Sequence, residues 1–161
     1  MAAYRSLFLI ALSLTCAAAL GQANPKCQVV PKSLAAMRNC YRPLLVFSPT
    51  ANDPRLRKQS QILDAAADDM MDRFVIFTPI VPTAKNFSAP LDTPYTRLSA
   101  QQMKSARAQF QIPADDFVVL LLGEDGSEKL RSTSPVGSAR LNALIDTMPS
   151  RKSEMQRPHA N

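Results

Sequence analysis

Three short runs of consecutive apolar residues predict three buried β-strands, at residues 44–47 (LLVF), 74–77 (FVIF) and 117–122 (FVVLLL). A continuous apolar run of this length is typical of a strand that is covered on both faces, whereas a strand with one solvated face alternates. The Asp125-Gly126 pair after the third run is a strong turn signal, so residues 128–131 are expected to return as a hairpin partner. We therefore predict a central sheet of about four strands.

Between these runs, apolar residues recur at helical spacing. The Asp-Pro pair at 53–54 places an N-cap before a proline at the first helical position, so a helix is expected over residues 54–72. A capping box predicts a second helix over residues 100–110. A third helix is expected over residues 141–148, and Pro149 is expected to stop it.

The predicted order is strand, helix, strand, helix, strand, strand, helix. A strand, a crossover helix and a second strand imply a parallel pair, while the hairpin adds antiparallel strands. A mixed central sheet with helices on both faces and this order is the thioredoxin-like α/β architecture. We predict that fold class.

Composition limits the possible chemistry. The chain has 161 residues, of which 46% are hydrophobic and 20% are charged, as expected for one folded domain. Its single histidine is His159, two residues from the C-terminus. A histidine-based triad, metal site or general base is therefore not expected, and no metal or cofactor is predicted.

The first residues have the layout of a secretory signal peptide. Arg5 precedes the uncharged apolar stretch 6–20, and small residues follow it. A membrane anchor is the alternative, but fifteen apolar residues fall short of the ~20 that span a bilayer. We predict a signal peptide at 1–23, a domain at 24–150, a basic flexible tail at 151–161, and no membrane span in the mature chain. The protein is expected to be exported and to be periplasmic or extracellular.

Export changes the meaning of the cysteines. Cys16 would leave with the signal peptide, so the mature chain would hold Cys27 and Cys40. Two thiols in an oxidising compartment most simply form one disulfide, which is our prediction. Free thiols and a redox pair are the alternatives, although the spacing is not that of a C-x-x-C motif.

The mature chain would be basic, with 18 Lys and Arg against 13 Asp and Glu and hence a net charge of +5. Basic proteins favour polyanions or acidic surfaces only where the charge clusters, and here it is mostly dispersed. The chain has no Trp, and its denser basic runs at 55–58 and 151–157 carry no interleaved aromatic residues. Nucleic acid is therefore not an expected partner, and a solvated basic face is the simpler interpretation.

Four segments of the chain resemble the domain of unknown function DUF4174. The resemblance covers about residues 34–155 and implies a thioredoxin-like fold in exported bacterial proteins and in animal extracellular-matrix proteins with sushi repeats. It implies no established reaction. The segments are 41–49 (YRPLLVFSP), 121–126 (LLGEDG), 129–131 (KLR) and 145–152 (IDTMPSRK).

The segment where this fold carries thiol chemistry contains no sulfur. In redox-active thioredoxins, a cysteine stands at the start of the helix after the first strand, where the helix dipole lowers its pKa. Here residues 48–54 offer the capping Asp53 instead. We therefore predict no catalytic residue and a binding or assembly module, whose partner is an unknown exported or extracellular protein or polyanion. The alternative is a thiol oxidoreductase or peroxidase-like activity that uses Cys27 and Cys40.

Three arginines lie in the segments that carry the resemblance. Arg42 opens the first strand, Arg131 closes the hairpin and Arg151 follows the last helix. The simpler hypothesis is that each forms an ion pair that holds the fold, for example Arg131 or Arg151 with Asp146. The alternative is a basic recognition patch.

Overall fold

A computed structural model of the chain describes residues 27–83 and 85–156. The signal peptide predicted at residues 1–23 lies outside these ranges. Among the described residues, no helix has the length and hydrophobicity needed to cross a membrane. In chain order, the elements are α1 (Leu34–Met37), β1 (Arg42–Phe47), α2 (Pro54–Asp64), α3 (Ala67–Asp72), β2 (Val75–Ile80), α4 (Ala100–Gln109), β3 (Val118–Leu122), β4 (Glu128–Ser132), α5 (Ser138–Ile145) and α6 (Pro149–Met155).

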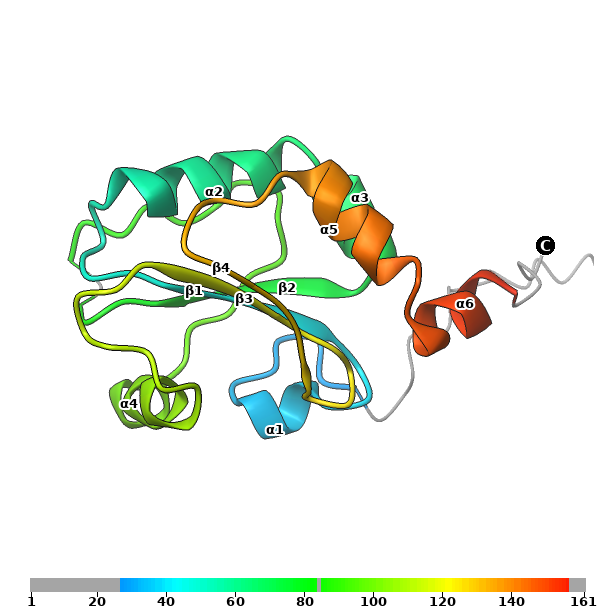
Figure 1. Cartoon of the computed structure of the whole chain (residues 1–161), viewed down its shortest axis with the longest axis horizontal. Helices are drawn as coiled ribbons and strands as arrows, with labels where there is room; N and C mark the ends of the chain where they lie inside the picture. The colour runs from blue at the N-terminus through cyan, green and yellow to red at the C-terminus, as the bar shows by residue number, and fades with distance from the viewer. Residues whose placement is uncertain (1–26, 84, 157–161) are drawn as a thin grey trace, which may run out of the picture.

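The four strands form one mixed sheet in the order β2-β1-β3-β4. β1 is parallel to β2, and β3 is antiparallel to both β1 and β4. Figure 1 shows α2, α3 and α5 over one face of the sheet, with α1 and α4 under the other. The predicted thioredoxin-like α/β fold with helices on both faces is confirmed.

The central strand β1 separates two hydrophobic cores. Its residues alternate between the two faces, so that Leu44 and Val46 join one core while Leu45 and Phe47 join the other. All four side chains are fully buried. Each such burial stabilises the fold by about 1.5–3 kcal/mol. Because both faces of the strand are covered, residues 44–47 form an unbroken apolar run.

The edge strand β2 extends past Pro79 and ends at Ile80. On its outer side, Phe77 donates its N–H to the Pro94 carbonyl at 2.9 Å and accepts from the Thr96 N–H at 2.9 Å. The backbone nitrogen of Pro79, two residues farther along the strand, points to the same outer side as that of Phe77. The N–H that proline lacks is therefore not needed for the hydrogen bonds between β1 and β2.

The single helix predicted over residues 54–72 is wrong, because α2 ends at Asp64 and α3 begins at Ala67. Ala66 leaves the helical region with a φ of −131° and provides no side-chain cap. The break has no sequence signal, since neither Gly nor Pro marks it. The apolar stripe also continues across it, because Leu63 and Met70 both enter the same core.

The flexible tail predicted from residue 151 is wrong for its first residues. The helix predicted over residues 141–148 and stopped by Pro149 in fact runs from Ser138 to Ile145 as α5. Pro149 instead occupies the first turn of a new helix, α6, where its missing N–H costs nothing. Arg151 is 8% exposed, buried against acidic groups of other elements. Residues 157–161 of the predicted tail lie outside the described ranges.

Candidate functional site

The α2 N-terminus lies where β1 ends, at the place where this architecture can activate a thiol. Asp53 is its N-cap, and the carboxylate accepts the Arg55 N–H at 2.8 Å. The Arg55 guanidinium closes over the same carboxylate, with Nη2 2.7 Å from Oδ2. These hydrogen bonds from Arg55 hold the pKa of Asp53 below its ordinary value. The helix N-terminus therefore holds a carboxylate that stays ionised near neutral pH.

Arg107 covers the carboxyl ends of the two parallel strands. Its guanidinium donates to the carbonyl of Ser48 at 2.9 Å and to that of Pro113 at 2.6 Å, and lies 5.5 Å from the ring centroid of Phe47. Burial lowers the pKa of Arg107. The sequence gives no sign of this role, because Arg107 reads as an ordinary basic residue in the last turn of a helix. The contacts join α4 to the sheet and use the donors that an anionic ligand would need.

The predicted disulfide between Cys27 and Cys40 is present, with a Cα–Cα distance of 5.7 Å. It lies just before β1, whereas the α2 N-terminus follows β1. Six strand residues at about 3.3 Å each place the two sites about 20 Å apart. The disulfide joins the segment before α1 to the start of β1, and the Tyr41 hydroxyl adds a 2.6 Å hydrogen bond to the Gln28 carbonyl.

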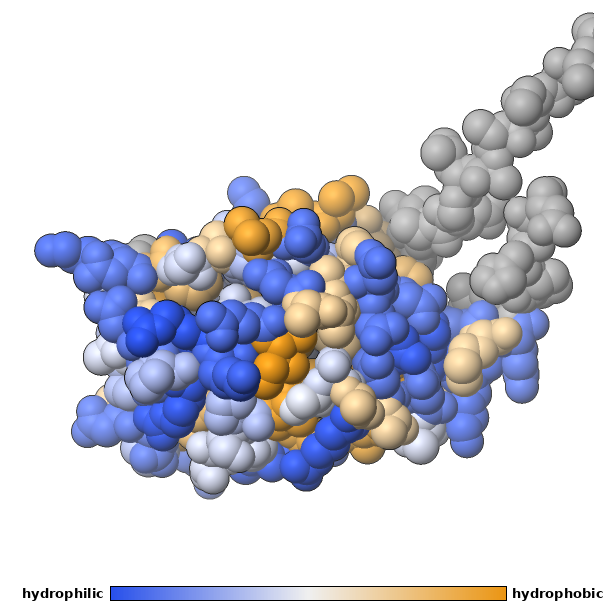
Figure 2. All heavy atoms as spheres, turned by 90° about the horizontal axis from the view of Figure 1, so that it is seen from above, coloured by the Kyte–Doolittle hydropathy of each residue, from blue (hydrophilic) through white to orange (hydrophobic). Residues whose placement is uncertain are grey.

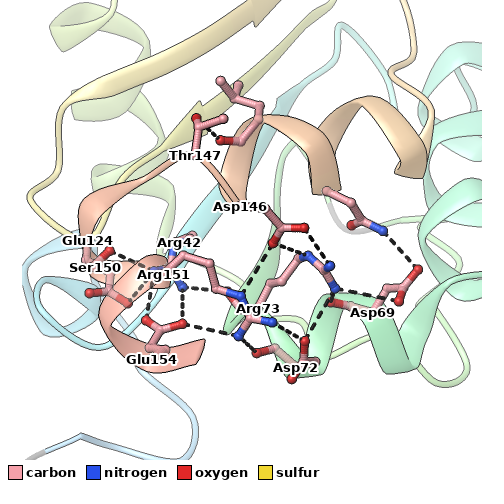
Figure 3. Close-up of polar contacts among 12 residues, drawn as sticks. Arg42, Asp69, Asp72, Arg73, Glu124, Asp146, Thr147, Ser150, Arg151 and Glu154 are labelled. Atoms are coloured by element: carbon pink, nitrogen blue, oxygen red, sulfur yellow. Dashed lines mark hydrogen bonds and ion pairs between the residues drawn. The ribbon is translucent and has the colours of Figure 1, made fainter. Parts of the chain in front are cut away.

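Arg42 lies at the centre of a polar cluster (Figure 3). It follows Cys40 by two residues, so the cluster lies at the same end of β1 as the disulfide. Its side chain is fully buried. It donates to the Arg73 carbonyl at 2.8 Å, to Ser150 Oγ at 2.7 Å and to Glu154 Oε1 at 2.8 Å. Glu124 completes the set, with Oε1 3.2 Å from Nη2. β1, the hairpin turn and α6 meet on this one guanidinium.

Arg151 and Asp146 belong to the same cluster. Arg151 pairs with Asp72, with Asp146 at 3.4 Å and with Glu154 at 3.4 Å. The Asp146 carboxylate also accepts a hydrogen bond from the Arg73 guanidinium at 2.9 Å, and this hydrogen bond holds the pKa of Asp146 below its ordinary value. Figure 3 shows the chain of contacts that runs from Arg42 through these groups. Three of the four positions selected from the sequence are thus connected.

Arg131 is the exception, and the suggested pair of Arg131 with Asp146 is not formed. Its guanidinium pairs with Glu128 on the same strand at 2.7 Å and donates to the Phe110 carbonyl at 3.2 Å. Both side chains of that pair are 39% exposed. β4 lies at the edge of the sheet, so Arg131 is held away from the cluster around Arg42.

Glu124 and Glu154 were not identified from the sequence. Glu124 precedes the Asp125-Gly126 turn, and a polar residue beside a turn needs no further explanation. Glu154 lies in the segment 151–161 that was predicted to be a flexible tail. Burial raises the pKa of Glu124; the charge of Arg42 opposes this, and the neighbouring Glu154 adds to it. The adjacent Asp125 behaves differently, because hydrogen bonds from Ser127 lower its pKa to about 2.

The cluster has the chemistry of a structural network. Its guanidiniums are engaged by carboxylates and carbonyls, so they do not form an open basic patch. Within residues 27–83 and 85–156, no three His, Cys, Asp or Glu side chains are placed to hold a metal ion. The arrangement fastens α6, α3 and the hairpin turn to the start of β1.

Comparison with known proteins identifies one family and a fold. The domain of unknown function DUF4174 matches residues 33–154 of the chain. No protein with a curated description matches it. Among solved structures, the reduced 2-Cys peroxiredoxin of Plasmodium vivax is 15% identical with a TM-score of 0.55, over 74% of this chain and 84% of that chain. Plasmodium yoelii thioredoxin peroxidase I is 16% identical with a TM-score of 0.54, over 80% and 84%. These likenesses show the thioredoxin fold alone.

Proposed function

The chain belongs to the DUF4174 family of domains of unknown function, and we propose that it is an exported thioredoxin-like module that acts by binding a partner, without thiol catalysis. The observation that carries this proposal is Asp53 at the N-terminus of α2. A thiolate at that place would gain from the helix dipole and from unpaired N–H groups. Here an ionised carboxylate that is 7% exposed and bonded to Arg55 occupies it.

The position of the disulfide also supports a binding role. Cys27 and Cys40 lie about 20 Å from the α2 N-terminus, at the other end of β1. In the segment between Cys27 and α1, the Pro31 carbonyl accepts a 2.7 Å hydrogen bond from the hydroxyl of Thr96. The disulfide therefore acts as one of several links that hold the segment before α1 against the domain.

A thiol oxidoreductase or peroxidase-like activity is the second candidate. It is favoured by the likeness to a 2-Cys peroxiredoxin and a thioredoxin peroxidase, and by a disulfide whose two residues are both partly exposed. In this candidate, the Cys27 and Cys40 thiols would be oxidised to the disulfide while a peroxide or a protein disulfide is reduced, and an external thiol would then reduce the disulfide again.

An exported or extracellular protein is the partner class that we propose. A polyanion would need clustered free cations, whereas Arg42, Arg73 and Arg151 are engaged in the buried cluster. The disulfide suits an oxidising compartment, which agrees with export.

The test is to compare what the wild-type protein and a Cys27→Ser/Cys40→Ser variant retain from an exported fraction. We expect both proteins to capture the same partner without a covalent link, because the disulfide holds the fold and does not touch the partner. Capture that occurs only as a mixed disulfide with the wild type, or that disappears with the cysteines in a folded variant, would contradict the proposal.

A further inference from the structure

A groove of about 270 Å³ lies between α2 and the loop at residues 86–91. Leu56, which is 2% exposed, forms part of its floor, and Phe87 packs against the hydrophobic core beside it. Arg57 and Asp64 lie along its α2 side, while Leu91 lies on its loop side. We call these five residues and the space between them the α2 groove.

The loop wall of the α2 groove is held in place by Asp64. One carboxylate oxygen, Oδ1, accepts the Thr93 N–H at 3.1 Å and the Thr93 hydroxyl at 2.8 Å. The other, Oδ2, accepts the Leu91 N–H at 3.0 Å. The loop then continues to the edge of β2, where Tyr95 forms a bridge with Phe77. The groove is therefore formed before any ligand binds, which lowers the entropic cost of binding.

The side chain of Leu91 is 90% exposed although its backbone is fixed. Single exposed leucines are common, but this one borders a cavity that also contains Leu56 and Phe87. Figure 2 shows the side of the molecule that carries α2, where hydrophobic residues reach the surface among hydrophilic ones. An apolar group in the groove would cover Leu91 together with the floor.

The two ends of the α2 groove differ in charge. Arg57 and Asp64 are seven residues apart on α2, which corresponds to about 10.5 Å along the helix axis. Arg57 is exposed and has no ion pair among the described residues. Asp64 Oδ2 accepts one hydrogen bond from the described chain and keeps capacity for another. A cationic end, an apolar middle and an anionic end thus follow one another over about three residues of an extended chain.

Resting on the proposed binding function, we propose that the α2 groove binds an extended segment of a partner protein. The segment would carry an apolar residue that covers Leu56, Phe87 and Leu91. It would carry an acidic residue toward Arg57 and a basic residue toward Asp64. This charge order sets the direction in which the segment lies.

A random heptapeptide display library, selected against the purified protein, tests the inference. We expect enriched peptides to share an apolar residue with an acidic residue on one side and a basic residue on the other. A synthetic peptide of that consensus, carrying a fluorophore, is then titrated by fluorescence anisotropy. We expect Arg57→Glu to weaken its binding about fivefold and Leu91→Ser about tenfold.

Matched controls separate the groove from general effects of charge and hydrophobicity. Arg140→Glu makes the same charge change at an exposed arginine of α5, and Val29→Ser removes an apolar side chain that is 89% exposed. Neither should alter peptide binding. A peptide whose acidic residue is replaced by lysine should recover binding to the Arg57→Glu variant, which a merely unfolded variant could not do.

Several results would overturn the inference. These are the absence of enriched peptides, enrichment of apolar peptides without a charge order, and equal binding to wild type, Arg57→Glu and Leu91→Ser. Concentration-dependent self-association that Leu91→Ser abolishes would assign the groove to a second copy of the chain instead. A partner that binds the groove variants with the same affinity as the wild type would exclude the α2 groove as the binding site but leave the proposed binding function intact.

Discussion

Removing Arg42 should destabilise the protein far more than removing an exposed arginine of the same sheet. Arg42 is fully buried and is shared by Glu124 and Glu154, whose side chains are only 18% and 12% exposed. An Arg42→Leu variant keeps an apolar side chain against the core but leaves two largely buried carboxyl groups without that cation. Breaking a buried pair in this way costs about 3–5 kcal/mol. Since domains of this kind are stable by about 5–15 kcal/mol, the loss should be large.

Arg131→Leu is the matched control, because it removes a guanidinium from a pair whose two side chains are both 39% exposed. Exposed pairs contribute about 1 kcal/mol or less. Urea unfolding followed by circular dichroism near neutral pH gives the free energy of unfolding and the m-value of each variant.

A second change identifies the origin of the loss. If the unpaired carboxylates cause it, Glu124→Gln in the Arg42→Leu background should recover part of the stability, because it removes one buried charge. Equal losses for Arg42→Leu and Arg131→Leu, with an unchanged m-value, would refute the role assigned to the cluster. So would the absence of any recovery in the double variant.

Three further changes have definite expected outcomes. Burial raises the pKa of Glu124, so ionisation of Glu124 opposes folding. The free energy of unfolding of the wild type should therefore fall as pH rises from about the ordinary pKa of Glu through the raised pKa. Urea unfolding at several pH values should show that Glu124→Gln loses this slope, and an unchanged slope would argue against Glu124 as its cause. The bonded carboxylate of Asp53 stabilises folding above its ordinary pKa of 3.8 and loses this effect as pH falls through its lowered value. Asp53→Ala should therefore cost about 0.5–2 kcal/mol near neutral pH and little in strong acid; a cost that does not change with pH would exclude the ionised cap as its cause. Replacing Cys27 and Cys40 by Ser should cost up to about 3 kcal/mol in thermal or urea unfolding. Thiol labelling of an unreduced protein that comprises residues 24–161 should find no free thiol under denaturant, whereas two labelled thiols would count against the disulfide.

Features with local causes were predictable from the sequence. The capping box of Ser99 and Gln102 forms with both of its hydrogen bonds, and the helix begins where it predicts. The hairpin turn at Gly126 has a φ of 77°, which glycine adopts at little cost. The apolar run of β1 likewise reports burial on two faces, because each neighbouring residue packs into a different core.

Features that depend on distant residues were not predictable in the same way. The burial of Arg151 depends on acidic groups such as Asp72, nearly eighty positions earlier in the chain. The division of α2 from α3 leaves no trace, because an alanine at position 66 fits either a helix or its end. The pairing of Arg42 with Glu154 joins the first strand to the last helix, so only the folded arrangement reveals it.

Consumption of peroxide by the reduced protein tests the proposed function most directly. The purified protein is supplied with hydrogen peroxide and a thiol reductant, and the rate is compared with that of the Cys27→Ser/Cys40→Ser variant and of buffer alone. Reduction of insulin is measured in the same preparations. We expect both proteins to remain at the buffer rate in both assays, because the α2 N-terminus presents the Asp53 carboxylate and the disulfide lies at the other end of β1. Turnover by the wild type that disappears with the two cysteines would contradict the binding role and establish thiol chemistry in its place.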